Sequence, residues 1–265
     1  MSYAVGFIGC GNMGGALLKA VALRLEKGEI AVFDKDESKT EKMRAEYGAD
    51  VVDIQTLAKQ AKFIVLGVKP QIMESALAPI AEILQNRTDA VIVTMAAGLS
   101  MAAIRDFIGK NLPIIRIMPN TPVTVGEGMV LYTALGVDDA DLERFKAHFS
   151  RAGKFDFVDE DLLDAGGALS GCGPAFVYAF AEALADGAAE CGVPKEKAAA
   201  WTAQTLLGAA NMLLAFGDPV ALRKAVCSPN GTTLAGVAAL EEKGFYDAAK
   251  SAVLAAYKRT LELKK

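Results

Sequence analysis

Short apolar runs alternate with segments of helical hydrophobic spacing over the first 160 residues of the chain. Such runs are typical of buried strands, whereas apolar residues three and four positions apart indicate helices. The expected strands are residues 3–8, 29–33, 51–52, 63–68, 90–94, 113–118, 129–133 and 155–158. The expected helices are residues 13–21, 38–47, 54–60, 72–84, 101–108 and 141–150. This alternation predicts an α/β domain over residues 1–160, built on a doubly wound parallel sheet.

The pattern changes after residue 160, where strand signals stop. Residues 174–191 and 194–216 are apolar nearly all round, and 52% of the whole chain is hydrophobic. A helix without a polar face must be buried on most sides, and a small helical domain cannot do this alone. We therefore expect an all-helical domain over residues 161–265 that packs against a second copy. One central helix in a monomeric bundle is the alternative, but two long helices share the feature.

A glycine-rich turn lies between the first expected strand and the first expected helix. Gly9, Gly11 and Gly14 follow the spacing Gly-x-Gly-x-x-Gly. In this context they allow a tight turn, close approach of a pyrophosphate and close packing of helix on strand. The N–H groups at the helix start would attract the phosphates. A flexible turn is the alternative, but the flanking pattern favours a Rossmann-type dinucleotide site at Ile8, Gly9, Cys10, Gly11, Asn12, Met13 and Gly14.

An acidic residue, Asp34, ends the second expected strand. An acid about twenty residues after the glycines usually accepts a hydrogen bond from the adenosine ribose, which favours NAD. Lys35 and Lys39 could instead supply the cation that a 2′-phosphate of NADP requires. The residues alone leave both dinucleotides open.

Ligands of a doubly wound sheet bind at the carboxyl ends of its strands. The expected ends carry further candidate cofactor residues: Val68, Lys69 and Pro70, then Ala96, Ala97 and Gly98, and finally Asn120. The small residues leave room for a flat ring or a ribose, and Asn120 could present an amide to a nicotinamide. Ordinary surface turns are the alternative for each of these segments taken alone.

A second dense group precedes the helical segment 234–242. Ser228, Gly231, Thr232 and Thr233 combine hydroxyl groups with backbone N–H groups at a helix start. This arrangement suits a carboxylate, although plain helix capping uses the same residue types. A third turn, residues 170–174, opens the first apolar helix, and capping is again the alternative there.

Charge, cysteine and histidine content narrow the function classes. The net charge is −4 and no Lys/Arg cluster stands out, so neither nucleic acid nor an anionic membrane is an expected partner. Cys10, Cys172, Cys191 and Cys227 form no Cys-x-x-Cys pair, as expected for reduced thiols in the cytoplasm. His148 is the only histidine, which argues against a histidine metal site or a Ser-His-Asp triad. We expect neither a signal peptide nor a membrane span, because charges, Gly and Pro interrupt the apolar stretches.

The motifs together resemble the pyrroline-5-carboxylate reductase family over essentially the whole chain. The matching segments are residues 7–14, 68–70, 96–98, 118–122, 169–174 and 228–233. The sequence departs from the family pattern at Asn230, where glycine is usual, although Asn also tolerates a left-handed backbone. It also departs at Asp34-Lys35, which replaces the usual phosphate-accepting turn.

The resemblance implies reduction of the cyclic imine 1-pyrroline-5-carboxylate to L-proline, the last step of proline synthesis. It implies NADP(H) as the favoured cofactor, with NAD(H) possible, and interlocked homodimers that assemble further. It places the substrate carboxylate and ring nitrogen at Ser228, Asn230, Gly231, Thr232 and Thr233, with Thr233 as the catalytic hydroxyl nearest the nitrogen.

Two other functions stay open. A 3-hydroxyacid dehydrogenase would share the architecture, but that class typically carries a Lys and, four residues later, an Asn in the helix after the sheet. Residues 174–191 contain neither. A non-catalytic nucleotide sensor would keep the fold, but it would have no need for the hydroxyl-rich loop at residues 228–233.

Overall fold

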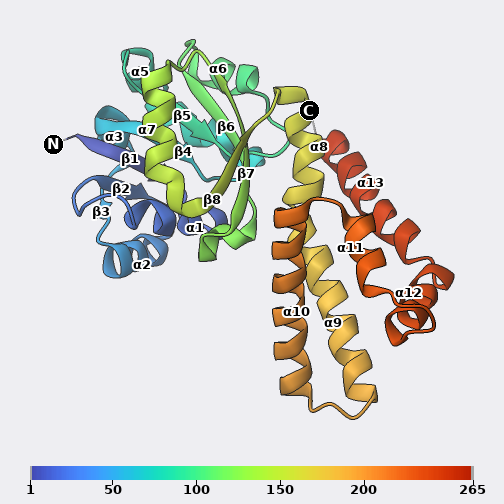
Figure 1. Cartoon of the computed structure of the whole chain (residues 1–265). Helices are drawn as coiled ribbons and strands as arrows, with labels where there is room; N and C mark the ends of the chain where they lie inside the picture. The colour runs from blue at the N-terminus through green and yellow to red at the C-terminus, as the bar shows by residue number, and fades with distance from the viewer. Residues whose placement is uncertain (1, 264–265) are drawn as a thin grey trace. The chain divides into compact units, whose positions relative to one another are not determined.

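The computed structural model describes residues 2–263 (Figure 1). These residues divide into two compact units, one comprising residues 2–172 with 256–263, the other comprising residues 173–255. The division falls after Cys172, one helix later than the boundary expected at residue 160. The reason is that helix α8 (Glu160–Ser170) packs against strands β6 and β7 of the sheet.

The first unit is built on one sheet of eight strands in the order β3-β2-β1-β4-β5-β6-β7-β8. All neighbouring strands are parallel except β6 and β7, which are antiparallel. The strands are β1 (Tyr3–Ile8), β2 (Ile30–Phe33), β3 (Asp50–Val51), β4 (Ala61–Leu66), β5 (Val91–Thr94), β6 (Ile114–Met118), β7 (Gly128–Leu135) and β8 (Gly153–Phe157). The predicted Rossmann-type sheet is confirmed.

Helices cover both faces of the sheet (Figure 1). One apolar core lies between the sheet and helices α1 (Asn12–Ala22), α2 (Glu37–Tyr47) and α7 (Asp139–Phe149). The other lies under helices α3 (Ile54–Gln60), α4 (Met73–Leu77), α5 (Ala81–Gln85) and α6 (Met101–Ile108). Successive strand residues contribute to opposite cores, as Phe7 and Ile8 do, because side chains alternate across a strand.

The helix expected over residues 72–84 is interrupted. The structure has 3₁₀ helix η1 (Pro70–Ile72), helix α4, 3₁₀ helix η2 (Ala78–Ile80) and helix α5 in its place. Pro79 explains the break, because proline has no N–H group and clashes with the preceding turn of an α-helix. Two further 3₁₀ helices, η3 (Thr121–Val125) and η4 (Ser150–Ala152), connect the last strands.

The remaining chain is helical throughout its described part. Its elements are α9 (Gly173–Glu190), α10 (Lys195–Phe216), α11 (Pro219–Val226), α12 (Thr232–Glu242) and α13 (Phe245–Leu263). Helices α9 and α10 pack against each other. Within residues 173–255, Ala198 and Thr202 alone are buried. Trp201, Leu207 and Phe216 are among the large apolar side chains that the single chain leaves exposed.

One apolar helical stretch, residues 160–190, is long enough to cross a membrane by length and composition alone. It contains the acidic residues Glu182 and Asp186, and the described residues hold no second stretch of this kind. A single stretch of this kind is weak evidence for a membrane span.

Candidate functional site

The glycine turn has the close contacts that a dinucleotide fingerprint requires. Gly9 has a φ of +99°, and a Cβ at Gly14 would lie 2.3 Å from the carbonyl oxygen of Gly9. A Cβ at Gly67, after strand β4, would lie 2.5 Å from the same oxygen. Nothing lies within 4 Å of a Cβ built at Gly11, so the turn is open on that side. These contacts match the tight turn, the close helix packing and the open ligand side expected of the three motif glycines.

Asp34 ties the turn to strand β2. Its Oδ2 accepts a hydrogen bond from the Cys10 N–H at 2.8 Å, and its Oδ1 accepts one from the Asp36 N–H at 3.0 Å. The Lys39 Nζ lies 4.0 Å from Oδ1. The hydrogen bond from the Cys10 N–H to Asp34, which holds the glycine turn, was not predicted from the sequence. Burial, followed by the charge of Asp34, raises the pKa of the Cys10 thiol to about 12, so this thiol stays protonated.

A cavity of about 480 Å³ brings many of the predicted cofactor residues together. Its lining includes Ile8, Gly9, Gly11, Asp34, Lys35, Val68 and Lys69. Ile54, Ile72 and Pro79 add an apolar wall of the kind that suits a flat base. Pro70 begins η1 beside this cavity, whereas Met13 packs against the sheet core.

A neighbouring cavity of about 440 Å³ is basic. Cys10, Gly11 and Asn12 line it together with Lys19, Lys39 and Lys42, and no Asp or Glu belongs to its lining. Gly11 and Lys39 line both cavities. An anionic group next to the Asp34 cavity would therefore meet several cations, two of which, Lys19 and Lys42, were not singled out from the sequence.

The turn after strand β5 carries the small residues expected near a ribose or ring. Ala96 is buried and its N–H donates to Thr94 Oγ1 at 3.3 Å. Ala97 is exposed, and Gly98 has a φ of +77°, a conformation that glycine adopts without strain. Helix α6 then begins at Met101, with the Ser100 hydroxyl accepting from the Ala103 N–H.

The Asn120 side chain makes hydrogen bonds within the protein. Its Nδ2 donates to the Ser170 carbonyl at 3.0 Å, and its Oδ1 accepts from the Met129 N–H at 2.9 Å. The side chain is 8% exposed, and a buried amide must find such partners. The Asn120 side chain therefore joins the end of strand β6 to strand β7 and to the end of helix α8, and its proposed contact with a nicotinamide stays a prediction.

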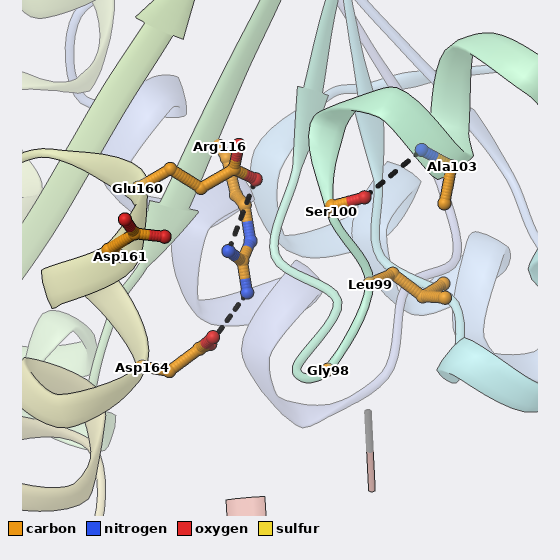
Figure 2. Close-up of a pocket in the computed structure, with 8 residues that line it drawn as sticks. All are labelled: Gly98, Leu99, Ser100, Ala103, Arg116, Glu160, Asp161 and Asp164. Atoms are coloured by element: carbon orange, nitrogen blue, oxygen red, sulfur yellow. Dashed lines mark hydrogen bonds and ion pairs between the residues drawn. The ribbon is translucent and has the colours of Figure 1, made fainter. Parts of the chain in front are cut away.

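Sequence reasoning missed a charge cluster at the same edge of the sheet, in which Arg116 and Asp164 are buried and Glu160 is partly exposed. Arg116, on strand β6, donates from Nη2 to Asp164 Oδ1 at 2.7 Å and from Nη1 to Glu160 Oε1 at 3.3 Å (Figure 2). These residues line a cavity of about 220 Å³ together with Gly98, Leu99, Ser100, Ala103 and Asp161. The signal was in the sequence: an arginine inside an otherwise apolar strand requires a buried counter-charge.

The hydroxyl-rich loop lies in the second unit. Asn230 has a φ of +59°, so it adopts the left-handed backbone conformation that Asn tolerates where glycine is usual. The Gly231 N–H donates to the Ser228 carbonyl at 3.0 Å, and Gly231 is the N-cap of helix α12. Thr232 and Thr233 are exposed in the first turn of that helix. The loop thus presents two hydroxyl groups beside an uncapped helix start.

Comparisons with known proteins find relatives over the whole length of the chain. The family model "Pyrroline-5-carboxylate reductase dimerisation" matches residues 160–263, and "NADP oxidoreductase coenzyme F420-dependent" matches residues 4–98. The chain is 35% identical over 270 residues to pyrroline-5-carboxylate reductase of Escherichia coli, covering 99% of this chain and 97% of the relative. It is 38% identical over 277 residues to the enzyme of Synechocystis, covering 100% of both.

Solved structures give the same result. A pyrroline-5-carboxylate reductase from Coxiella burnetii superposes with a TM-score of 0.89 at 31% identity, covering 100% of both chains. Pyrroline carboxylate reductase of Plasmodium falciparum, with NADP bound, has a TM-score of 0.89 at 28% identity, covering 99% of this chain and 98% of that chain.

The fold and the glycine turn define a dinucleotide-dependent oxidoreductase with an appended helical dimerisation domain. Identity of 35–38% across the full length then fixes the family. The chain belongs to the pyrroline-5-carboxylate reductase family.

Proposed function

We propose that this protein reduces 1-pyrroline-5-carboxylate to L-proline with a nicotinamide dinucleotide, the last step of proline biosynthesis. The observation that carries the proposal is that one chain holds both a dinucleotide turn and the hydroxyl-rich loop at residues 228–233. Relatives named pyrroline-5-carboxylate reductase match this chain from end to end, in bacteria and in plants.

The residues fit the chemistry without a strong acid. A protonated cyclic imine is already a good electrophile, so its reduction depends mainly on alignment. The dinucleotide, when bound, supplies the hydride. Thr233 would hold the substrate near its ring nitrogen, and the N–H groups in the first turn of helix α12, beginning with that of Thr232, would hold the carboxylate. Ser228 and Asn230 would shape that loop, since the Ser228 carbonyl already accepts the Gly231 N–H.

The open side of Gly11 and the cavity beside it support a dinucleotide at the first unit. NADP(H) is the favoured form, because Lys19, Lys39 and Lys42 line the basic cavity next to Asp34 and could receive a 2′-phosphate. NAD(H) stays possible, because each Asp34 oxygen accepts one hydrogen bond within the protein and has a further lone pair for a ribose hydroxyl.

The assembly is a homo-oligomer, in keeping with the dimerisation family match over residues 160–263. We propose that the helical domains of two copies interlock and that dimers associate further. A cytoplasmic location is in keeping with four free cysteines among the described residues.

The direct test is turnover by the purified chain. We expect consumption of NADPH or NADH that depends on pyrroline-5-carboxylate, with L-proline as the product. A cofactor that is deuterated at its transferred position should deliver one deuterium to carbon 5 of proline. Oxidation of 3-hydroxyacids without imine reduction would identify the alternative dehydrogenase. Dinucleotide binding without turnover of either substrate class would identify a sensor.

A further inference from the structure

We propose that Arg116 and Glu160 are positioning residues for the nicotinamide half of the dinucleotide. This inference rests on the proposed function. They would act through the turn at residues 96–100 without touching the cofactor. In a doubly wound sheet the strands before and after the crossover bind different halves of a dinucleotide. Strands β4 to β6 form the second half here, so the turn after β5 faces the nicotinamide side.

The charge cluster itself is built to be rigid. The Arg116 side chain is 3% exposed, and its two terminal nitrogens contact two different carboxylates one helical turn apart, Glu160 and Asp164. A guanidinium whose two terminal nitrogens are each bound to a carboxylate has little freedom to rotate. Helix α8 is therefore held to strand β6 along its first turn.

Glu160 extends the cluster to the candidate cofactor turn. Its Oε1 accepts the Met101 N–H at 2.9 Å in addition to the Arg116 contact. Met101 is the first residue of helix α6, so the carboxylate also fits the positive end of that helix. The other end of the turn is held by the bond from the Ala96 N–H to Thr94 Oγ1. Glu160 thus fixes the side of the turn that the strand leaves free.

Gly98 and the charge cluster line the same cavity (Figure 2). A shift of Arg116 or Glu160 would therefore change the shape of the cavity that Gly98 lines. The same helix is tied a second time, because Asn120 donates to the Ser170 carbonyl at its far end. Both strand ends that flank the nicotinamide side are therefore fastened to helix α8.

Another ion pair in the same unit provides a matched control. Lys62, at the beginning of strand β4, contacts Asp141 Oδ2 at 2.6 Å, and the Asp141 side chain is 9% exposed. Strand beginnings lie at the sheet edge opposite to the ligand edge. Breaking this pair should lower stability without altering either half of the cofactor site.

The experiment compares two ligands on four proteins: wild type, Glu160→Gln, Arg116→Lys and Lys62→Gln. NADP⁺ reports on both halves of the site, whereas 2′,5′-ADP carries no nicotinamide. For Glu160→Gln and Arg116→Lys we expect the Kd of NADP⁺ to rise about tenfold, the equivalent of about 1.4 kcal/mol. The Kd of 2′,5′-ADP should stay within about twofold, which is small on that scale. For Lys62→Gln the melting temperature should fall while both Kd values stay at the wild-type level.

Several results would overturn the inference. One is an equal loss of NADP⁺ and 2′,5′-ADP affinity in the Arg116 and Glu160 variants. Another is an unchanged Kd for NADP⁺ in folded variants, and a third is the same NADP⁺ loss in Lys62→Gln. If the wild-type chain reduces pyrroline-5-carboxylate and the variants give any of these results, the inference about Arg116 and Glu160 is wrong and the proposed function stands. A wild-type chain that binds neither ligand refutes it together with the proposed cofactor site.

Discussion

The sheet unit and the helical unit bury their apolar residues in different ways. The sheet unit has two cores within one chain, and Phe7, Leu17 and Ile64 are among its fully buried side chains. Residues 173–255 bury Ala198 and Thr202 alone, whereas Trp201 and Leu207 are more than half exposed. The amino-acid pattern of the helices is as apolar as a core, so the missing contacts must come from outside the single chain.

This difference assigns separate tasks to the two regions. The sheet unit can hold a dinucleotide with contacts made inside one chain, such as the Asp34 bond to the glycine turn. The helical unit carries the hydroxyl-rich loop, and we expect its stability to depend on a second copy. Substrate handling should therefore depend on assembly more strongly than cofactor binding does.

The largest expected effect comes from placing a charge on the exposed apolar surface of helix α10. Leu207 is 55% exposed in the single chain, and Leu207→Asp would bury one carboxylate from each copy at the interface. We expect loss of the dimer by light scattering and loss of imine turnover. Leu23→Asp is the control, because Leu23 is 65% exposed in the sheet unit. A dimer that survives Leu207→Asp unchanged would mean that helix α10 lies outside the interface.

A cavity in the sheet unit should destabilise it by an amount that does not depend on protein concentration. Leu17, on helix α1, is 0% exposed, and Leu17→Ala should lower the free energy of unfolding by about 2–5 kcal/mol. Denaturant unfolding at several protein concentrations measures this. A loss that varied with concentration would show that the sheet unit also depends on the second copy.

The hydroxyl of Thr233 tests the substrate task of the helical unit. Thr233→Val keeps the side-chain shape and removes the hydroxyl, so kcat/KM for the imine should fall by about 10- to 100-fold. The Kd of NADPH should stay constant, because the dinucleotide turn lies in the sheet unit. If turnover is unchanged, or if cofactor affinity falls as much as turnover, the loop is only a helix cap.

Asp34 tests the cofactor task of the sheet unit. Asp34→Ser removes a negative charge beside the basic cavity, and the ratio of kcat/KM values should shift about tenfold towards NADPH, about 1.4 kcal/mol. Steady-state kinetics with both cofactors measures the shift. If kcat/KM falls with both cofactors, part of that fall would come from the missing hydrogen bond between Asp34 and the Cys10 N–H. An unchanged ratio would mean that Asp34 serves the turn alone.

The smallest expected effect is a pH dependence from His148 in the sheet unit. Burial lowers its pKa below the ordinary 6.5, and its ring packs edge-on against Phe63. The unfolded chain therefore binds more protons than the folded chain below about pH 6.5, and stability falls as the pH drops through that region. Urea midpoints at about pH 7.5 and pH 5.5 should differ less for His148→Gln than for wild type. Equal pH dependence in both proteins would assign the effect to other groups.

The sequence predicted the parts of the fold that depend on local pattern. Apolar runs located the strands, and the glycine spacing located the turn, because each is recorded within a few neighbouring residues. The interrupted helix after Pro70 shows where a local signal was overlooked, since Pro79 was visible in the sequence. The boundary between units moved to Cys172 because helix α8 packs on the sheet, which no local pattern records.

The site was predicted as a set of residues rather than as a set of contacts. The turn glycines and Asp34 were found, but the bond from Asp34 to Cys10 links positions 24 residues apart. The bond from Asn120 to the Ser170 carbonyl could not be predicted either, because the two residues lie 50 positions apart. Arg116 could have been found from its place in an apolar strand, although its partners on helix α8 could not.

The most direct test of this account measures assembly and turnover in one sample. Sedimentation velocity of the wild-type chain should give a mass that is a multiple of two 27.8 kDa subunits from nanomolar to micromolar concentration. The same sample should convert pyrroline-5-carboxylate to proline throughout that range. A folded 27.8 kDa monomer that reduces the imine at the full rate would contradict the claim that the helical unit needs a second copy to work.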